Sequence, residues 1–536
     1  MSSTTQREHA SGHGSGQGSG QDAGLSATDD AQQATQQTAQ QNEATKDESL
    51  RHRLNLKPAW FALAHVVLIA ILLLPSPDGL SWQGQIALAV LGFAVVMWIT
   101  EAVTYPVSAI MIIAYLALLL GLSGDPDAPG AAFGTKNGLT TALAGFSSSG
   151  VALVAAALAL AAAMQATGLH KRVALLVLKI AGEKISHIVA GAIIISIILA
   201  FFVPSATARA GAVVPILLGM VAAFGLASNS KLSALLIITA AQSISIWNVG
   251  IKTAAAQNLV ALNFIEDSMG RSVSWGQWFL WAAPWSVLMS IALFFIMRWA
   301  IKPEVDRMDG GKETVRRQLE EIGPITGPEI RLIVVSIALL FFWSTEGFLH
   351  PVDSSTITLV AIGFLLLPRV GVFTWKKAEN LINWGTLVVF AVGISLGTLL
   401  LKTGAAGWLS QKTFGAMGLD SMPLLATIIL VGAFTVIIHL GFASATALSS
   451  ALIPVYIALA ATLNTPDGGL GFVVIQQFLI SFGFLLPVSA PQNMLAYGTG
   501  AFTTKQFLRT GIPLTIIGYA LVVLFSATYW KWLGLV

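Results

Sequence analysis

The sequence predicts an all-α polytopic membrane protein: eleven spans, with two inverted-topology five-span repeats that each carry a re-entrant helical hairpin. Three observations lead to this fold class. Charged residues are scarce, apolar runs are long enough to cross a bilayer, and a set of short motifs occurs twice in the same order.

The composition excludes an ordinary water-soluble domain. Of the 536 residues, 55% are hydrophobic and only 10% are charged, whereas soluble domains average about 25% charged residues. The lipid bilayer must therefore solvate much of the chain. The formal net charge of +3 gives no reason to expect a nucleic-acid partner. Because the chain has no cysteine, disulfides, iron–sulfur clusters and thiol catalysis are excluded.

Residues 1–54 are expected to form a disordered cytoplasmic tail. The first 50 are mostly Ser, Thr, Gln, Gly and Ala and include no aromatic residue. Such a segment cannot bury enough apolar surface to offset the entropy lost on ordering. It also lacks the apolar core of a signal peptide.

The rest of the chain contains apolar runs that approach the ~20 residues a helix needs to cross a bilayer. They lie near 59–75, 84–103, 105–123, 148–180, 231–250, 278–301, 331–348, 354–368, 384–412, 471–490 and 511–533. Two longer apolar stretches, about 186–226 and 422–463, are each interrupted in the middle by small polar residues. These two stretches are the expected hairpins.

Basic residues predict the orientation in a cell (plasma or inner) membrane. Arg51, Arg53 and Lys57 precede the first span, and the charged loop 302–329 carries five more basic residues. Both segments are expected in the cytoplasm. An odd count of spans then places the C-terminal Val536 outside.

Five motifs recur about 240 residues later in the same order, which indicates an internal duplication. The pairs are Trp98-Ile99-Thr100-Glu101 with Trp343-Ser344-Thr345-Glu346, Thr167-Gly168 with Thr403-Gly404, Ser205-Ala206-Thr207-Ala208 with Ser444-Ala445-Thr446-Ala447, Ala256-Gln257-Asn258 with Pro491-Gln492-Asn493, and Gln277 to Pro284 with Gln506 to Pro513. The first span and first repeat are assigned to 55–301 and the second repeat to 330–536. Because five spans is an odd number, the repeats should have opposite orientations, as in secondary transporters.

The hairpin tips are the first candidate site. They are Ser205-Ala206-Thr207 and Ser444-Ala445-Thr446, each at the expected start of a helix. Helix N-termini present free N–H groups and a positive dipole end, which suits a carboxylate. The alternative is that these small residues only permit close helix packing.

A second pair of breaks contributes further candidates. Asn258 follows one break, and Ser489 and Asn493 flank Pro491 at the other, where an Asn amide can donate to a carboxylate. Arg209 and His439 lie near the tips, and ionisable residues inside a membrane suggest function. The alternatives are a structural arginine and a hydrogen-bonded core imidazole.

These motifs resemble the divalent anion/sodium symporter family over roughly residues 55–536. The resemblance rests on Trp98-x-Thr-Glu101, the paired tips, and Ser481 through Leu495. It implies transport of dicarboxylates, citrate or sulfate by a homodimer with an elevator-type mechanism. It also implies that tips reading Ser-Asn-Thr bind substrate carboxylates and sodium.

The segments Pro204 to Gly211 and His439 to Thr446 depart from that pattern and resemble the exchanger branch of the family, which includes 2-oxoglutarate/malate translocators and citrate or tartrate/succinate antiporters. The tip Asn is replaced by Ala206 and Ala445. Phe201 and Leu440 stand where sodium-coupled members tend to carry a small polar residue. Side-chain ligands for sodium are thus lost, although backbone carbonyls can supply some. No other cofactor and no metal site is expected.

The resulting hypothesis is a carboxylate exchanger in which Arg209 and His439 compensate the substrate charge. A sodium- or proton-coupled symporter of carboxylates or sulfate is the alternative. A polytopic membrane enzyme and an anion channel are the other classes, and no catalytic cluster in the spans favours an enzyme. The sequence does not identify the particular anion.

Overall fold

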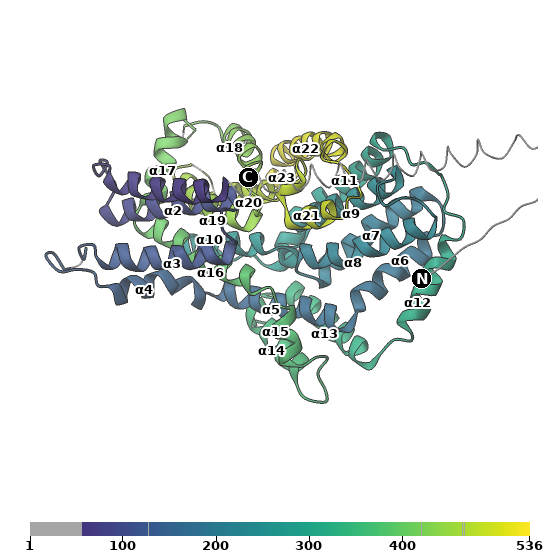
Figure 1. Cartoon of the computed structure of the whole chain (residues 1–536). Helices are drawn as coiled ribbons and strands as arrows, with labels where there is room; N and C mark the ends of the chain where they lie inside the picture. Colours follow the sequence, from purple (N-terminus) through teal and green to yellow (C-terminus); the bar gives the residue numbers. More distant parts are fainter. Residues whose placement is uncertain (1–55, 127, 420, 464, 466) are drawn as a thin grey trace, which may run out of the picture. The chain divides into compact units, whose positions relative to one another are not determined.

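The computed structural model describes residues 56–126, 128–419, 421–463, 465 and 467–536 (Figure 1). The expected tail and the basic residues Arg51 and Arg53 lie outside this range. The regular structure of the described part is helical, and its β-type pairing is limited to three isolated bridges. The expectation of an all-α protein is confirmed.

In the first half of the chain, a helix at Leu56–Leu73 comes first. It is followed by α2 Trp82–Thr100, α3 Tyr105–Gly121, α4 Thr135–Leu143, η1 Ala144–Ser147, α5 Ser149–Thr167, α6 Leu169–Ala181, α7 Ile185–Phe202, α8 Ala206–Ala223, α9 Lys231–Gly250, η2 Lys252–Ala254, α10 Ala256–Met269 and α11 Trp275–Ala300.

The second half begins with α12 Gly311–Ile322, which lies in the charged loop. It continues with α13 Gly327–Thr345, α14 Ser354–Leu366, α15 Trp375–Leu381, α16 Trp384–Lys402, α17 Ala405–Thr413, η3 Gly415–Met417, α18 Leu424–His439, α19 Ala445–Ala460, α20 Leu470–Ile480, η4 Pro487–Ser489, α21 Pro491–Gly498, α22 Thr504–Ala527 and α23 Tyr529–Trp532.

Within the described residues, ten helices are long and apolar enough to cross a membrane. This confirms the expectation of a multi-pass membrane protein. The helices α3 and α14, at two of the expected spans, have only 17 and 13 residues. The total of eleven spans therefore stays a prediction.

Two apolar runs that the sequence suggested as single elements are each divided into two helices. The run 148–180 breaks between α5 and α6 at Gly168, and the run 384–412 breaks between α16 and α17 at Gly404. These glycines have φ of 76° and 73°. Because such left-handed backbone favours glycine, the helix ends there although the surrounding residues stay apolar.

The duplicated motifs have matching local structure in the two halves. Gln277 and Gln506 each complete a capping box, at the starts of α11 and α22. Thr100 and Thr345 each donate a hydroxyl hydrogen bond to the carbonyl four residues earlier. The repeated sequence therefore encodes repeated local geometry. The inverted orientation of the halves remains a prediction.

Packing between the halves determines where the candidate site lies. Helix α8, which follows the first tip, packs against α21 of the second half, and α19, which follows the second tip, packs against α10 of the first half. Helix α9 is buried from Leu232 to Gly250. Each hairpin thus contacts the broken helix of the other repeat.

Candidate functional site

The two hairpin tips have nearly the same geometry. Ser205 is the N-cap of α8 with φ −146° and ψ 111°, and Ser444 is the N-cap of α19 with φ −132° and ψ 112°. The Ser205 hydroxyl accepts from the Ala208 N–H at 3.3 Å, and the Ser444 hydroxyl accepts from Ala447 at 3.2 Å. Each cap satisfies one N–H and leaves earlier N–H groups of the first turn available to a ligand.

The first two residues after each cap are a small alanine and a polar threonine. Ala206 and Ala445 are the first residues of α8 and α19. The hydroxyls of Thr207 and Thr446 form no hydrogen bond within the described part of the chain. Both tips therefore keep a free hydroxyl beside free backbone donors.

The second pair of breaks is also duplicated in structure. Ala255 and Ala490 have extended backbones with φ/ψ of −146°/138° and −156°/142°. The Asn258 amide donates to the Asn248 carbonyl at 2.7 Å, and the Asn493 amide donates to the Gly483 carbonyl at 2.7 Å. Each amide thus satisfies a carbonyl that the broken helix leaves unpaired.

A reciprocal pair of hydrogen bonds links the broken helices of the two halves. Gln257 donates to the Ser481 hydroxyl at 3.3 Å, and Gln492 donates to the Ser245 hydroxyl at 2.9 Å. The glutamines occupy equivalent positions of the duplicated motif. Sequence reasoning emphasised the neighbouring asparagines and missed this role, although the duplicated Gln was the available signal.

Arg209 is the most unusual charged residue of the site. It is fully buried, and its Nη2 donates to the Asn248 side-chain oxygen at 2.5 Å and to the Ala254 carbonyl at 2.9 Å. Its Nε and Nη1 have no partner. No carboxylate of the described residues forms an ion pair with it. The guanidinium is therefore buried with neutral partners and with unused donors.

His439 lies beside the other broken helix, at the end of α18. It is 2% exposed, and its Nε2 lies 3.1 Å from the Ser489 carbonyl. Because a carbonyl only accepts, Nε2 carries a hydrogen, while Nδ1 has no partner. The carbonyls of Ala254 and Ser489, which Arg209 and His439 contact, directly precede the extended residues Ala255 and Ala490. The two ionisable residues thus contact equivalent carbonyls of the two halves from different positions, Arg209 after its tip on α8 and His439 before its tip on α18.

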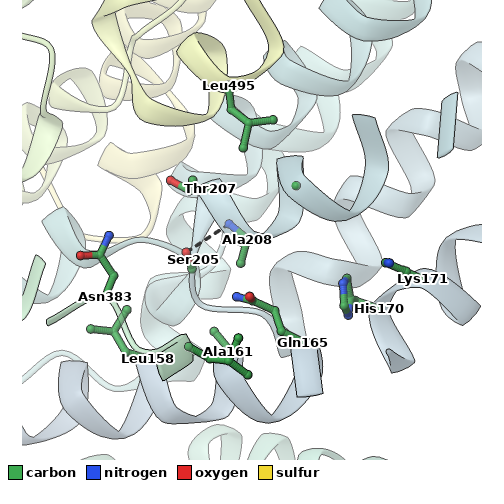
Figure 2. A pocket seen from close by; sticks show the side chains of 12 residues that line it. Leu158, Ala161, Gln165, His170, Lys171, Ser205, Thr207, Ala208, Asn383 and Leu495 are labelled. Atoms are coloured by element: carbon green, nitrogen blue, oxygen red, sulfur yellow. Dashed lines mark hydrogen bonds between the residues drawn. The ribbon is translucent and has the colours of Figure 1, made fainter. Parts of the chain in front are cut away.

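A cavity of about 510 Å³ lies against the first tip (Figure 2). Its lining residues are Leu158, Ala161 and Gln165 of α5, His170 and Lys171 of α6, Ser205 at the tip, Thr207, Ala208 and Gly211 of α8, Leu381 and Asn383 before α16, and Leu495 of α21. The second tip does not contribute to this lining. That both tips converge on one cavity therefore stays a prediction.

Some residues that line the cavity were not singled out from the sequence, and two duplicated glutamates end helices. Gln165, Lys171 and Asn383 line the cavity, but only the fold brings them to the tip. Glu101 and Glu346 are the C-cap residues of α2 and α13.

Membrane-spanning helices, paired hairpins with helix N-termini at their tips and duplicated broken helices define a polytopic membrane transporter. The chain belongs to the family described as the sodium:sulfate symporter transmembrane region, whose model matches residues 57–536. This finding confirms the resemblance to the divalent anion/sodium symporter family. The protein is accordingly a transporter and not an enzyme.

Three relatives illustrate the range of the family. A membrane protein of Cupriavidus necator is 48% identical over 89% of this chain and 93% of its own. A citrate/succinate antiporter of Escherichia coli is 28% identical over 87% of this chain and 96% of its own. The sodium-dependent dicarboxylate transporter SdcS of Staphylococcus saprophyticus is 24% identical over 86% and 89%.

A solved structure has a similar fold. The YdaH transporter of Alcanivorax borkumensis superposes with a TM-score of 0.53 at 14% identity, covering 80% of this chain and 98% of that protein. At this identity the likeness concerns the arrangement of helices alone.

Proposed function

We propose that this protein exchanges di- or tricarboxylate anions across a cell membrane. The observation that carries the proposal is the buried Arg209, which has two neutral oxygen partners and two nitrogens without partners. A buried charge without a counter-charge costs several kcal/mol. Such a group is retained where an anion completes its hydrogen bonds, and a carboxylate suits the planar guanidinium.

The remaining donors come from the duplicated tips and breaks. Further, uncharged donors for the bound anion are the first-turn N–H groups beside Ser205 and Ser444, the hydroxyls of Thr207 and Thr446, and the amide of Asn493. The citrate/succinate antiporter relative supports an organic anion as cargo. Asn258 and Ser489 hold the breaks in shape beside these donors, with Ala206 and Ala445 allowing close approach.

Exchange follows from a positive charge that cannot leave. In the empty site, the Arg209 charge has no anionic partner and moving it through a low-dielectric barrier is costly. When a dianion binds, Arg209 compensates one of its charges, and a proton taken up on the free Nδ1 of His439 would bring the site close to neutrality. The empty carrier is then held at one side, and a substrate must bind before the carrier returns.

Sodium-coupled symport is the second candidate, because the family description and one relative refer to sodium. Against it, Phe201 replaces a polar residue and packs in an aromatic cluster, with ring centroids 6.0 Å from Trp275 and 5.9 Å from Phe279. Leu440 likewise offers no side-chain oxygen. Sodium would depend on backbone carbonyls for most of its ligands.

We also propose the family's homodimer and elevator-type movement, with the N-terminus and loop 302–329 in the cytoplasm and Val536 outside. A C-terminal reporter that is active only in the cytoplasm would contradict this orientation, whereas one active only outside supports it.

Uptake of a radiolabelled dicarboxylate into proteoliposomes separates exchange from symport. Vesicles loaded with unlabelled dicarboxylate should take up label without a sodium gradient, and empty vesicles should not. Strong uptake into empty vesicles that follows an inward sodium or proton gradient would instead establish symport. A competition panel of succinate, malate, tartrate, citrate and sulfate would then identify the preferred anion.

A further inference from the structure

The cavity at the first tip has one lysine in a lining of mostly apolar and neutral polar side chains. Among its twelve lining residues, Lys171 is the only one of the types Lys, Arg, Asp and Glu. Most of the others are apolar or neutral polar side chains. At about 510 Å³, the cavity falls within the range typical of small-molecule sites.

Lys171 has no partner that would explain its place in this wall. Its ammonium forms no hydrogen bond or ion pair within the described part of the chain, and its side chain is exposed. The neighbouring residue Arg172 behaves differently, since its guanidinium contacts the carboxylate of Glu329 at 2.7 Å and is buried. Lys171 therefore offers an unused cation to the cavity.

The tip and Lys171 belong to different elements of the lining. Ser205 and Thr207 come from the hairpin, whereas Lys171 lies on α6 near its start. Figure 2 shows Lys171 beyond Gln165 and Ala208 as seen from Ser205. The cavity lining thus includes a helix N-terminus, an ammonium on another helix and the amide of Gln165.

We propose that Lys171 is a specificity-determining residue that binds the substrate carboxylate pointing away from the tip. This inference rests on the proposed function. An anion with charge at both ends contacts the tip donors and the ammonium together, whereas a compact dianion such as sulfate contacts only one of them. The flexible four-carbon stem of Lys lets one site accept anions of different length.

The test measures binding directly, by thermal unfolding of the purified full-length protein against increasing succinate, citrate or sulfate. In the Lys171→Gln variant, the dissociation constants for succinate and citrate should rise roughly tenfold, as expected for one lost hydrogen bond to a charged group. The constant for sulfate should change less than about twofold. Lys171→Arg, which keeps the charge, should retain most of the affinity for succinate.

A matched control distinguishes a specific contact from a general electrostatic attraction. Lys179 is also an exposed lysine of α6 but does not line the cavity, so Lys179→Gln should bind all three anions like the wild type. Equal losses for succinate and sulfate in Lys171→Gln, or no loss at all, would overturn the proposal. If wild type and Lys179→Gln bind none of these anions, the proposed function itself fails.

Discussion

Replacing Arg209 with methionine tests whether this residue supports the fold or the substrate. Arg209→Met keeps much of the side-chain volume but removes a fully buried cation. It also removes the donors to the Asn248 side chain and to the Ala254 carbonyl. A structural role predicts that the variant loses stability without substrate but binds substrate normally. A role in binding predicts nearly unchanged stability without substrate and much weaker binding.

Without substrate, the opposing terms should nearly cancel. Each acceptor left unpaired costs about 1–3 kcal/mol, while removing a desolvated charge without a counter-charge returns several kcal/mol. The free energy of unfolding should therefore change by less than about 2 kcal/mol. The thermal midpoint should consequently move by only about 5 °C or less.

With substrate, the variant should lose the stabilisation that the anion provides. Losing two charge-assisted hydrogen bonds, at about 1.5 kcal/mol each, raises the dissociation constant roughly 100-fold. At a dicarboxylate concentration of 100 times the wild-type constant, binding stabilises the wild type by about 2.7 kcal/mol and the variant by only about 0.4 kcal/mol.

The assay is thermal unfolding of purified wild type and Arg209→Met across a dicarboxylate titration, with Arg209→Lys as the conservative control. Arg209→Lys should recover only part of the affinity, because an ammonium lacks the planar fork of the guanidinium. A variant whose midpoint falls by more than about 10 °C without substrate, yet which binds dicarboxylate normally, would show that Arg209 is structural.

Contacts of His439, of the two duplicated glutamines and of Glu183 can be tested in the same way. His439→Leu should weaken dicarboxylate binding by roughly tenfold or less, because His439 forms a single hydrogen bond and, unlike Arg209, can be neutral. An affinity loss as large as that of Arg209→Met would contradict this expectation. Because the contacts of Gln257 and Gln492 are reciprocal, Gln257→Ala and Gln492→Ala should each lower the free energy of unfolding by about 1–2 kcal/mol, measured by chemical denaturation. Markedly unequal losses would argue against equivalent roles in the two halves. The Gly310 N–H and the Arg307 guanidinium lower the pKa of Glu183, so the contact between loop 302–311 and the base of the first hairpin should be stable at neutral pH and weaken as the pH falls below about 4.5. Hydrogen exchange of 302–311, corrected for its intrinsic pH dependence, should rise in acid and, at neutral pH, in Glu183→Gln; no change in either would refute the role of this carboxylate.

The sequence predicted the breaks of the apolar stretches well, because their cause is local. Ser205 and Ser444 are good N-cap residues placed within runs that are otherwise apolar, and both cap a helix in the structure. By contrast, the helix ends at Gly168 and Gly404 were missed as ends. There the backbone turns through a left-handed glycine while the apolar pattern continues.

The candidate site could be predicted only in part, because its contacts join residues far apart in the chain. The duplicated Asn258 and Asn493 were recognised, but their bonds to carbonyls ten residues earlier depend on how each helix breaks. Lys171 gave no signal, since an exposed lysine beside a glycine turn is common. Only the packing of α5 and α6 beside the hairpin brings it to the cavity.

Efflux from preloaded vesicles tests most directly the central claim that the empty carrier cannot return. Proteoliposomes filled with radiolabelled dicarboxylate are diluted into medium with or without unlabelled dicarboxylate, at matched sodium and pH on both sides. Rapid loss of label is expected only when external dicarboxylate is present. Equally rapid loss into medium without any anion substrate would contradict the claim.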